Sequence, residues 1–245
     1  ASSVKSKRTH NIGVLLPEIA MIFFPDVLEG IDSAAKERGY KLFFLSTGYN
    51  FEEEKENLKF LKSSWVDGIL LDSCCKQADM PEYLKLLTTN IPSKNVPVVT
   101  LESSFHSKKL GFVGIDHVKY TKMAIQHLIE QGHRDIAIMG GPGHLPLSAD
   151  NMQGYKEALR EAGLPIKEEN YLQGDYLPVS GYDAVKKAFT QGKKPTWTAL
   201  FCANDQMAIG AVKAAINLGI KIPGQLAIMG FDNVFPGSLI DPQLT

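Results

Sequence analysis

Short apolar runs alternate with longer amphipathic segments along the whole chain. An apolar run of four to six residues is typical of a buried strand, and an apolar stripe at helical spacing is typical of a helix packed on a sheet. The pattern passes through one such series and then begins again. The first series predicts strands at 12–16, 41–45, 66–71, 96–101 and 111–115 and helices at 23–38, 52–62 and 80–88. The second predicts strands at 136–139, 171–173, 199–202 and 226–231 and helices at 120–131, 152–162, 181–191 and 206–218.

This alternation predicts an α/β fold in which two doubly wound parallel sheets form two lobes. Glycine follows four of the predicted helices and favours the left-handed backbone that ends a helix. These are Gly39, Gly132, Gly163 and Gly219. We expect an N-terminal lobe over residues 12–115 and a C-terminal lobe over residues 116–245, with the join at 115–117.

Composition narrows the class of protein. The 245 residues carry 26 Lys and Arg against 27 Asp and Glu, a net charge of −1, and 44% of them are hydrophobic. This balance excludes a disordered chain and disfavours a nucleic-acid-binding surface over most of the chain. No run approaches the roughly 18 apolar residues of a membrane span. Three cysteines form no disulfide framework, so the default expectation is the cytoplasm, although a mature exported protein would also lack its signal.

Polar residues follow most of the predicted strands. In open parallel sheets ligands bind outside the carboxyl ends of the strands, so these residues predict a polar ligand cleft between the lobes. Tyr176 and the pair Phe23 and Phe24 could stack on an apolar ligand face. The alternative is that Asp and Asn stand there as helix caps and turn residues. The strand-end set comprises Asp72, Ser73, Glu102, Ser103, Asp116, Gly140, Gly141, Asp175, Tyr176, Asn204, Asp205, Asp232 and Asn233.

Several motifs suggest other chemistry but fail on context. The glycines of residues 140–143 match no phosphate-loop pattern, and Pro142 removes a backbone donor, which favours a plain turn. Ser33 and Lys36 have the S-x-x-K spacing, yet they lie inside a predicted helix without companion motifs. The histidines have no metal-ligand spacing. The vicinal pair Cys74 and Cys75 has no C-x-x-C context, which favours a structural role over a redox role. We therefore expect no enzyme, no metal and no cofactor.

Four stretches together resemble the effector-binding core of the LacI/GalR family of bacterial transcription regulators. They are RTHNIGV at 8–14, the segment 57–69 ending in VDGI, HLIEQGHRDIA at 127–137, and the pair ANDQMAIG at 203–210 and MGFDN at 229–233. They occur in order and at the family's spacing, and the resemblance covers the whole chain. It implies a fold shared with periplasmic sugar-binding proteins (type I).

The resemblance also gives the chain's two ends a meaning. It implies that residues 1–11 are the remnant of a hinge, with Val4 at the family's minor-groove wedge position and Lys5, Lys7 and Arg8 near the phosphate backbone. It implies that a helix-turn-helix head lies outside this chain and that the C-terminal return to the first lobe is missing. The implied partners are a small-molecule effector, operator DNA through the absent head, and a second copy in a homodimer.

Family ligand positions carry over residue by residue. The implied set is Phe23, Phe24, Asp72, Cys74, Glu102, Asn151, Tyr176, Asn204 and Asp232. Asn151 stands where the family often has an arginine. Without that bidentate donor a carboxylate or phosphate effector is disfavoured, and a neutral sugar is favoured.

Two other classes of protein, a solute-binding protein and an enzyme, predict different features in the sequence. A transport-associated solute-binding protein would share fold and cleft, but it predicts an export signal, and the basic segment 5–8 argues against it. A small α/β enzyme would need a catalytic constellation, which the sequence does not show. We expect an allosteric regulator core that senses a sugar and controls operator binding.

Overall fold

The structure, a computed structural model, describes residues 8–18, 21–63, 66–89, 96–102, 105, 107–192 and 194–244. The chain divides into two compact units, Ala1–Ile115 and Asp116–Thr245. No helix in the described part of the chain is long and apolar enough to cross a membrane.

The first unit is built on a five-stranded sheet in the order β2-β1-β3-β4-β5, with every neighbouring pair parallel. Its core consists of the apolar residues of the central strands and of two helices, among them Leu15, Ile69, Leu71, Leu58 and Tyr83. The elements are β1 (Asn11–Leu16), α1 (Phe23–Glu37), β2 (Lys41–Ser46), α2 (Phe51–Ser63), β3 (Gly68–Asp72), α3 (Met80–Thr88), β4 (Val98–Leu101) and β5 (Gly111–Val113).

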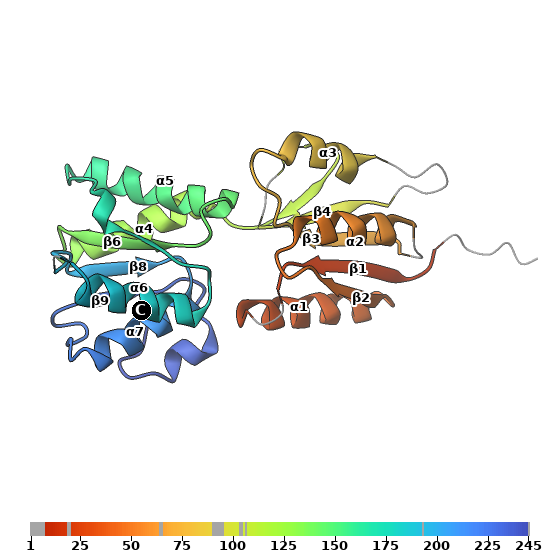
Figure 1. The fold of residues 1–245 in the computed structure, drawn as a ribbon. Helices are drawn as coiled ribbons and strands as arrows, with labels where there is room; N and C mark the ends of the chain where they lie inside the picture. Colours follow the sequence, from red (N-terminus) through yellow and green to blue (C-terminus); the bar gives the residue numbers. More distant parts are fainter. Residues whose placement is uncertain are drawn as a thin grey trace, which may run out of the picture. The chain divides into compact units, whose positions relative to one another are not determined.

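The second unit is built on a four-stranded parallel sheet in the order β7-β6-β8-β9. Helices α4 and α5 lie on one side of this sheet and α6 and α7 on the other (Figure 1). The elements are α4 (His117–Glu130), β6 (Ile136–Gly140), α5 (Pro146–Glu161), the 3₁₀ turn η1 (Glu168–Asn170), β7 (Tyr171–Gln173), α6 (Pro178–Thr190), β8 (Ala199–Cys202), α7 (Asp205–Asn217), β9 (Ala227–Met229) and η2 (Phe235–Ser238).

The predicted fold class, two doubly wound parallel sheets, is confirmed, and the helix-ending glycines have positive φ. The predicted boundaries were wrong mainly at helix starts. Helix α5 begins at Pro146 rather than 152, and α6 at Pro178 rather than 181. Both prolines stand in the first turn, where a missing N–H costs no hydrogen bond, so proline marks a helix start rather than a break.

Helices α6 and α7 cross at glycines. An ideal Cβ on Gly210 would lie 1.9 Å from the carbonyl oxygen of Pro178, and one on Gly181 would lie 2.1 Å from that of Met207. Each glycine therefore lets the backbone of one helix touch the backbone of the other.

Candidate functional site

Two carboxylates stand at neighbouring strand ends of the first unit. Asp72 is the last residue of β3 and pairs in register with Leu101 of β4, and Glu102 follows directly. Burial raises the pKa of Asp72 well above its ordinary value, and the negative charges of Glu102 and Glu54 raise it further. Negative charge is therefore already disfavoured at this edge, which suits a neutral ligand with hydrogen-bonding groups better than an anion.

A buried carboxylate fixes the loop after β3. The Glu54 side chain on α2 is fully buried. It accepts hydrogen bonds from Ser73 Oγ at 2.5 Å, from the Cys74 backbone N–H at 2.8 Å and from Cys74 Sγ at 3.0 Å. The loop that follows Asp72 and carries Cys74 is thereby held on the first turn of α2.

The vicinal cysteines are buried in this loop. Burial, followed by the charge of Glu54, raises the pKa of the Cys74 thiol, and the same causes raise the pKa of Cys75 to about 12. Neutral thiols are poor nucleophiles. The geometry therefore supports the structural interpretation of the pair.

The aromatic pair lies at the start of α1. Phe23 is its first residue and is partly exposed, whereas Phe24 is buried. Their rings meet edge to face with centroids 5.6 Å apart. Phe23 is therefore the one of the two whose side chain is accessible, and Phe24 belongs to the core.

In the second unit, Asn204 connects two strand-end loops. Its Oδ1 accepts from the Met207 N–H at 2.9 Å as the N-cap of α7, and its Nδ2 donates to the carbonyl oxygen of Tyr176 at 2.9 Å. Asn204 thus acts as a helix cap, as the alternative interpretation of strand-end residues holds, and it also positions Tyr176.

Tyr176 is packed onto the loop after β6. It has a positive φ of 70°, and its OH lies 3.3 Å from Ser148 Oγ. An ideal Cβ on Gly141 would lie 2.0 Å from the Tyr176 ring. The ring therefore explains the glycine at this position without a phosphate, in agreement with the prediction of a plain turn.

Asp205 has a role that the sequence did not reveal. Its Oδ2 accepts from the Val234 N–H at 2.8 Å, and a Cβ on Gly230 would lie 2.0 Å from its Oδ1. Asp205 thereby holds the loop after β9, where Asp232 is exposed and has a φ of 92°. The positive φ at Asp232 marks a strained backbone of the kind that collects at binding sites.

Asn151 lies inside the helix layer. It is buried on α5, and its Oδ1 accepts from Thr121 Oγ1 of α4 at 3.0 Å. The contact between α4 and α5 at this position is therefore made by a neutral amide and a hydroxyl group.

Of the hinge residues, Val4, Lys5 and Lys7 lie outside the described residues, and Arg8 is exposed. Ser33 and Lys36 are exposed on α1, where Lys36 pairs with Asp32. Within the described ranges, no group of three His, Cys, Asp or Glu side chains could hold a metal ion.

Sequence reasoning missed Glu54 and Ser148, and it listed Asp205 only as one of the strand-end residues. Glu54 stands in a run of acidic residues that is indistinguishable from a solvated helix face. The one signal in the sequence is the apolar residue Leu58, one helical turn after Glu54, which indicates that this side of α2 faces inward.

Comparisons with known proteins agree with this architecture. The family described as periplasmic binding proteins and sugar binding domain of LacI family matches residues 9–245. Catabolite control protein A of Priestia megaterium is 34% identical over 246 residues, covering 100% of this chain and 71% of the relative. The HTH-type transcriptional repressor PurR of Photorhabdus laumondii subsp. laumondii is 33% identical, covering 100% and 70%.

A solved structure, the transcriptional regulator CelR–cellobiose complex, superposes with a TM-score of 0.82 at 26% identity, covering 97% of this chain and 72% of that one. The sequence, the two parallel sheets and these relatives agree, and the chain belongs to the LacI family of transcription regulators, of which it carries the effector-binding core.

Proposed function

We propose that this core binds a neutral sugar at the carboxyl ends of its strands and thereby controls operator binding. The observation that carries the proposal is the family match over residues 9–245 on a fold whose strand ends carry Asp72, Glu102, Tyr176 and Asp232. The two units are proposed as the two lobes, 12–115 and 116–245. The alternative of a solute-binding transport protein is disfavoured, because the relatives are transcription regulators.

The chemistry of the strand ends favours a neutral effector. Negative charge is already disfavoured at Asp72 beside Glu102, and Asn151, at the position where the family often has an arginine, provides no bidentate cation for a phosphate or carboxylate. Carboxylates accept hydrogen bonds from sugar hydroxyls, and a partly exposed aromatic ring such as that of Phe23 can stack on a sugar's apolar face.

A thermal-shift screen with neutral sugars, sugar phosphates and purines tests this choice, since a ligand of the native state raises the melting temperature by mass action. Neutral sugars are expected to give the larger shifts. A sugar phosphate or a purine that gave the largest shift would contradict the proposed effector class.

Affinity measurements on variants then locate the binding site. With the best neutral sugar, Asp72→Asn and Tyr176→Ala are each expected to weaken binding by about tenfold or more. Asp183→Asn, an exposed position on α6, is the matched control and should leave affinity unchanged. An effect of only one of the first two variants would mean that one unit alone holds the ligand.

The core is also proposed to form a homodimer. Phe43 and Phe60 are 47% and 49% exposed with ring centroids 6.1 Å apart, and Phe235 and Leu239 of the C-terminal segment are 71% and 68% exposed. Clustered exposed apolar side chains mark interaction surfaces. Light scattering after gel filtration is expected to give twice the monomer mass. Phe43→Lys should reduce it, whereas Ile166→Lys, an exposed residue elsewhere, should not.

The DNA activity is proposed for the whole protein, in the cytoplasm, with no catalytic role. In a gel-shift assay, full-length protein should bind one promoter site specifically, and the effector should change that affinity by about 5- to 150-fold. Absence of specific DNA binding with and without effector would refute the regulator proposal.

A further inference from the structure

One carboxylate holds the chain where it enters the first unit. Asp67 directly precedes β3 and is partly buried. Its Oδ1 and Oδ2 both accept from the Thr9 backbone N–H at 3.0 Å. Its Oδ1 also accepts from Thr9 Oγ1 at 3.1 Å, and its Oδ2 accepts from the His10 N–H at 2.9 Å. Hydrogen bonds to a carboxylate are stronger than those between neutral groups, so Asp67 is an anchor for two successive residues far away in the sequence.

The backbone beside this anchor is bent, and the bend is held from both sides. His10 has a φ of 57°, in the left-handed region that non-glycine residues adopt rarely. The His10 carbonyl oxygen accepts from the Lys41 N–H at 2.8 Å, and the Asn11 carbonyl oxygen accepts from the Asp67 N–H at 2.7 Å. The His10 ring also packs against Tyr40, with ring centroids 5.3 Å apart. A strained turn persists only where its surroundings hold it, so the chain enters β1 from one fixed direction.

The same strand leads from this anchor to the proposed effector site. β3 begins directly after Asp67 and ends at Asp72, and it lies between β1 and β4 in the sheet. Its length corresponds to about 16 Å at the usual rise of a strand. Ile69 and Leu71 are buried, so β3 is part of the packed core. One central strand therefore has a proposed effector contact at its carboxyl end and the anchor just before its amino end.

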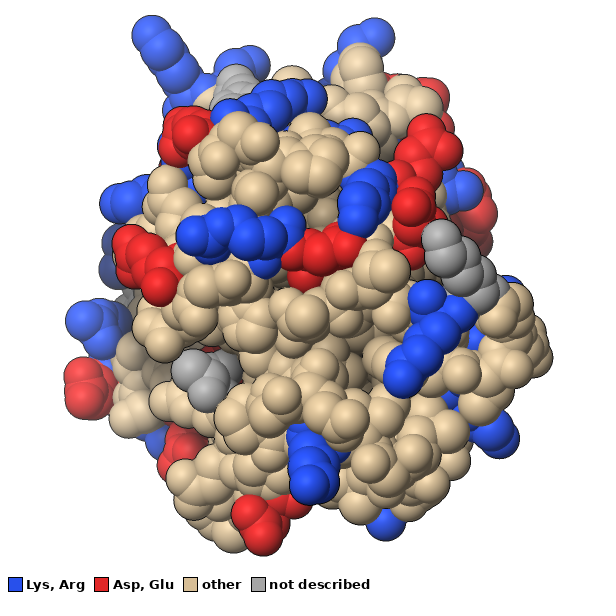
Figure 2. Space-filling view, turned by 90° about the vertical axis from the view of Figure 1, so that its left-hand side faces the viewer, with Lys and Arg blue, Asp and Glu red and all other residues tan. Residues whose placement is uncertain are grey.

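The distribution of charge favours the segment before Thr9 as the route to DNA. A surface that contacts DNA gathers Lys and Arg on one face. The face shown in Figure 2 instead mixes basic and acidic side chains without a large field of one sign. Lys5, Lys7 and Arg8 are a basic cluster in the sequence, and Asp67 holds the residue that directly follows them.

We infer that Asp67 is a positioning residue for operator binding, which fixes the point and the direction in which the chain leaves the first unit toward the proposed DNA-binding head. The inference rests on the proposed function, because it concerns how the effector-binding core holds that head. Specific binding requires a fixed register on the DNA, whereas non-specific binding depends on charge. Loss of the anchor is therefore expected to weaken specific binding without weakening non-specific binding.

Amide hydrogen exchange tests the anchor in this chain without DNA or effector. Asp67→Ala removes the acceptor, so the Thr9 and His10 N–H groups are expected to exchange about tenfold faster or more. Asp79→Ala, at an exposed aspartate before α3, is the matched control and should leave both rates unchanged. The Ile69 N–H, hydrogen-bonded within the same unit, should keep its rate in both variants if the sheet is intact. Unchanged exchange at Thr9 and His10 in Asp67→Ala would overturn the anchor.

Gel-shift titration of the full-length protein tests the consequence for DNA. In Asp67→Ala, operator affinity is expected to fall about tenfold or more, with no loss of affinity for unrelated DNA or, measured without DNA, for the effector. Thr9→Val, which removes the Oγ1 donor and keeps the N–H, should give a smaller fall. The double variant should bind operator no more weakly than Asp67→Ala alone, because Thr9 Oγ1 acts through Asp67.

The other outcomes are distinguishable. Wild-type operator affinity in Asp67→Ala overturns the inference and leaves the proposed function standing. Tighter binding to both DNAs also overturns it, because Asp67 would then act only through its charge. An equal fall for both DNAs together with weaker effector binding would mean damage to the fold, and Thr9→Val then decides: full operator affinity in that variant overturns the inference. No specific binding by the wild-type protein would refute the regulator proposal and this inference together.

Discussion

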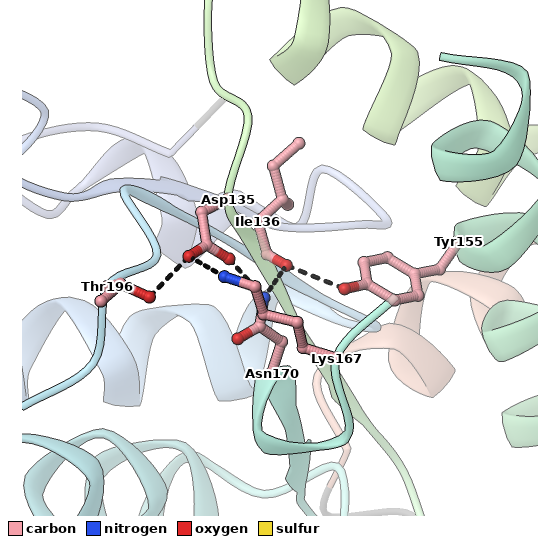
Figure 3. Close-up of polar contacts among 6 residues, drawn as sticks. All are labelled: Asp135, Ile136, Tyr155, Lys167, Asn170 and Thr196. Atoms are coloured by element: carbon pink, nitrogen blue, oxygen red, sulfur yellow. Dashed lines mark hydrogen bonds and ion pairs between the residues drawn. The ribbon is translucent and has the colours of Figure 1, made fainter. Parts of the chain in front are cut away.

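At the scale of single residues, carboxylates that accept several hydrogen bonds organise both units. Glu54 holds the loop after β3 in the first unit, and Asp135 gathers three donors at the start of β6 in the second (Figure 3). Glu54 satisfies the buried groups of Ser73 and Cys74, which would otherwise be left unpaired, so its removal costs more than the bonds themselves.

Glu54→Ala is expected to lower the free energy of unfolding by about 3 kcal/mol, because it leaves the Ser73 hydroxyl and the Cys74 N–H buried without their acceptor. Effector affinity should fall as well, since Asp72 directly precedes the loop that Glu54 holds. Denaturant unfolding and effector titration measure the two effects. Glu53→Ala, exposed one residue earlier on α2, is the control. Equal stability of the two variants would contradict the assigned role.

Asp135 gives a pH dependence with a definite sign. Burial alone would raise its pKa, but hydrogen bonds from Lys167, Thr196 and Asn170 lower it on balance below the ordinary value of 3.8. A carboxyl whose pKa is lower in the folded state adds stability above its unfolded pKa and loses it as the pH falls through the folded one.

Asp135→Ala should therefore destabilise the protein by about 2 kcal/mol at pH 7 and by clearly less near pH 3. Urea unfolding of both proteins at the two pH values measures the difference. Asp183→Ala, exposed on α6, should show no such pH-dependent gap. A gap as large at pH 3 as at pH 7 would show that packing, and not the carboxylate charge, accounts for the effect.

At the scale of elements, the close crossing of α6 and α7 depends on glycine. A Cβ at Gly210 would meet the Pro178 backbone, which cannot move aside as a flexible side chain can. Gly210→Ala is expected to lower the free energy of unfolding by about 2 kcal/mol, by overpacking.

Gly30 provides the opposite case for the same substitution. It lies within α1 with nothing within 4 Å of an added Cβ. Gly30→Ala should raise the free energy of unfolding by about 1 kcal/mol through helix propensity alone. Chemical denaturation of both variants gives the comparison, and a stabilising Gly210→Ala would refute the contact.

At the scale of the whole molecule, the proposed effector is expected to stabilise both units together. Glu54→Ala destabilises the first unit and Asp135→Ala the second, so the melting temperature of each variant reports on the unit that carries the substitution. With a saturating neutral sugar, the melting temperatures of both variants should rise, because a ligand held by residues of both units stabilises both native states. A rise in only one variant would restrict the binding site to the unit that responds.

The sequence by itself determined the two doubly wound sheets, the order of their elements and the family, because these depend on hydrophobic periodicity and on short motifs that are local in the chain. It also placed Asp72, Glu102 and Asp232 at strand ends. It could not determine what Asn204 and Tyr176 do, since the bond between them joins residues 28 positions apart.

Only the tertiary structure decided which polar residues serve the fold. Glu54, Asp205 and Asn151 look alike in sequence to solvated residues or ligand contacts, and burial turns each into an internal hydrogen-bond partner. The three hydrogen bonds that Asp135 accepts likewise join segments that lie far apart in the sequence. Burial and long-range hydrogen bonds come from folding in three dimensions, and no local pattern along the chain encodes them.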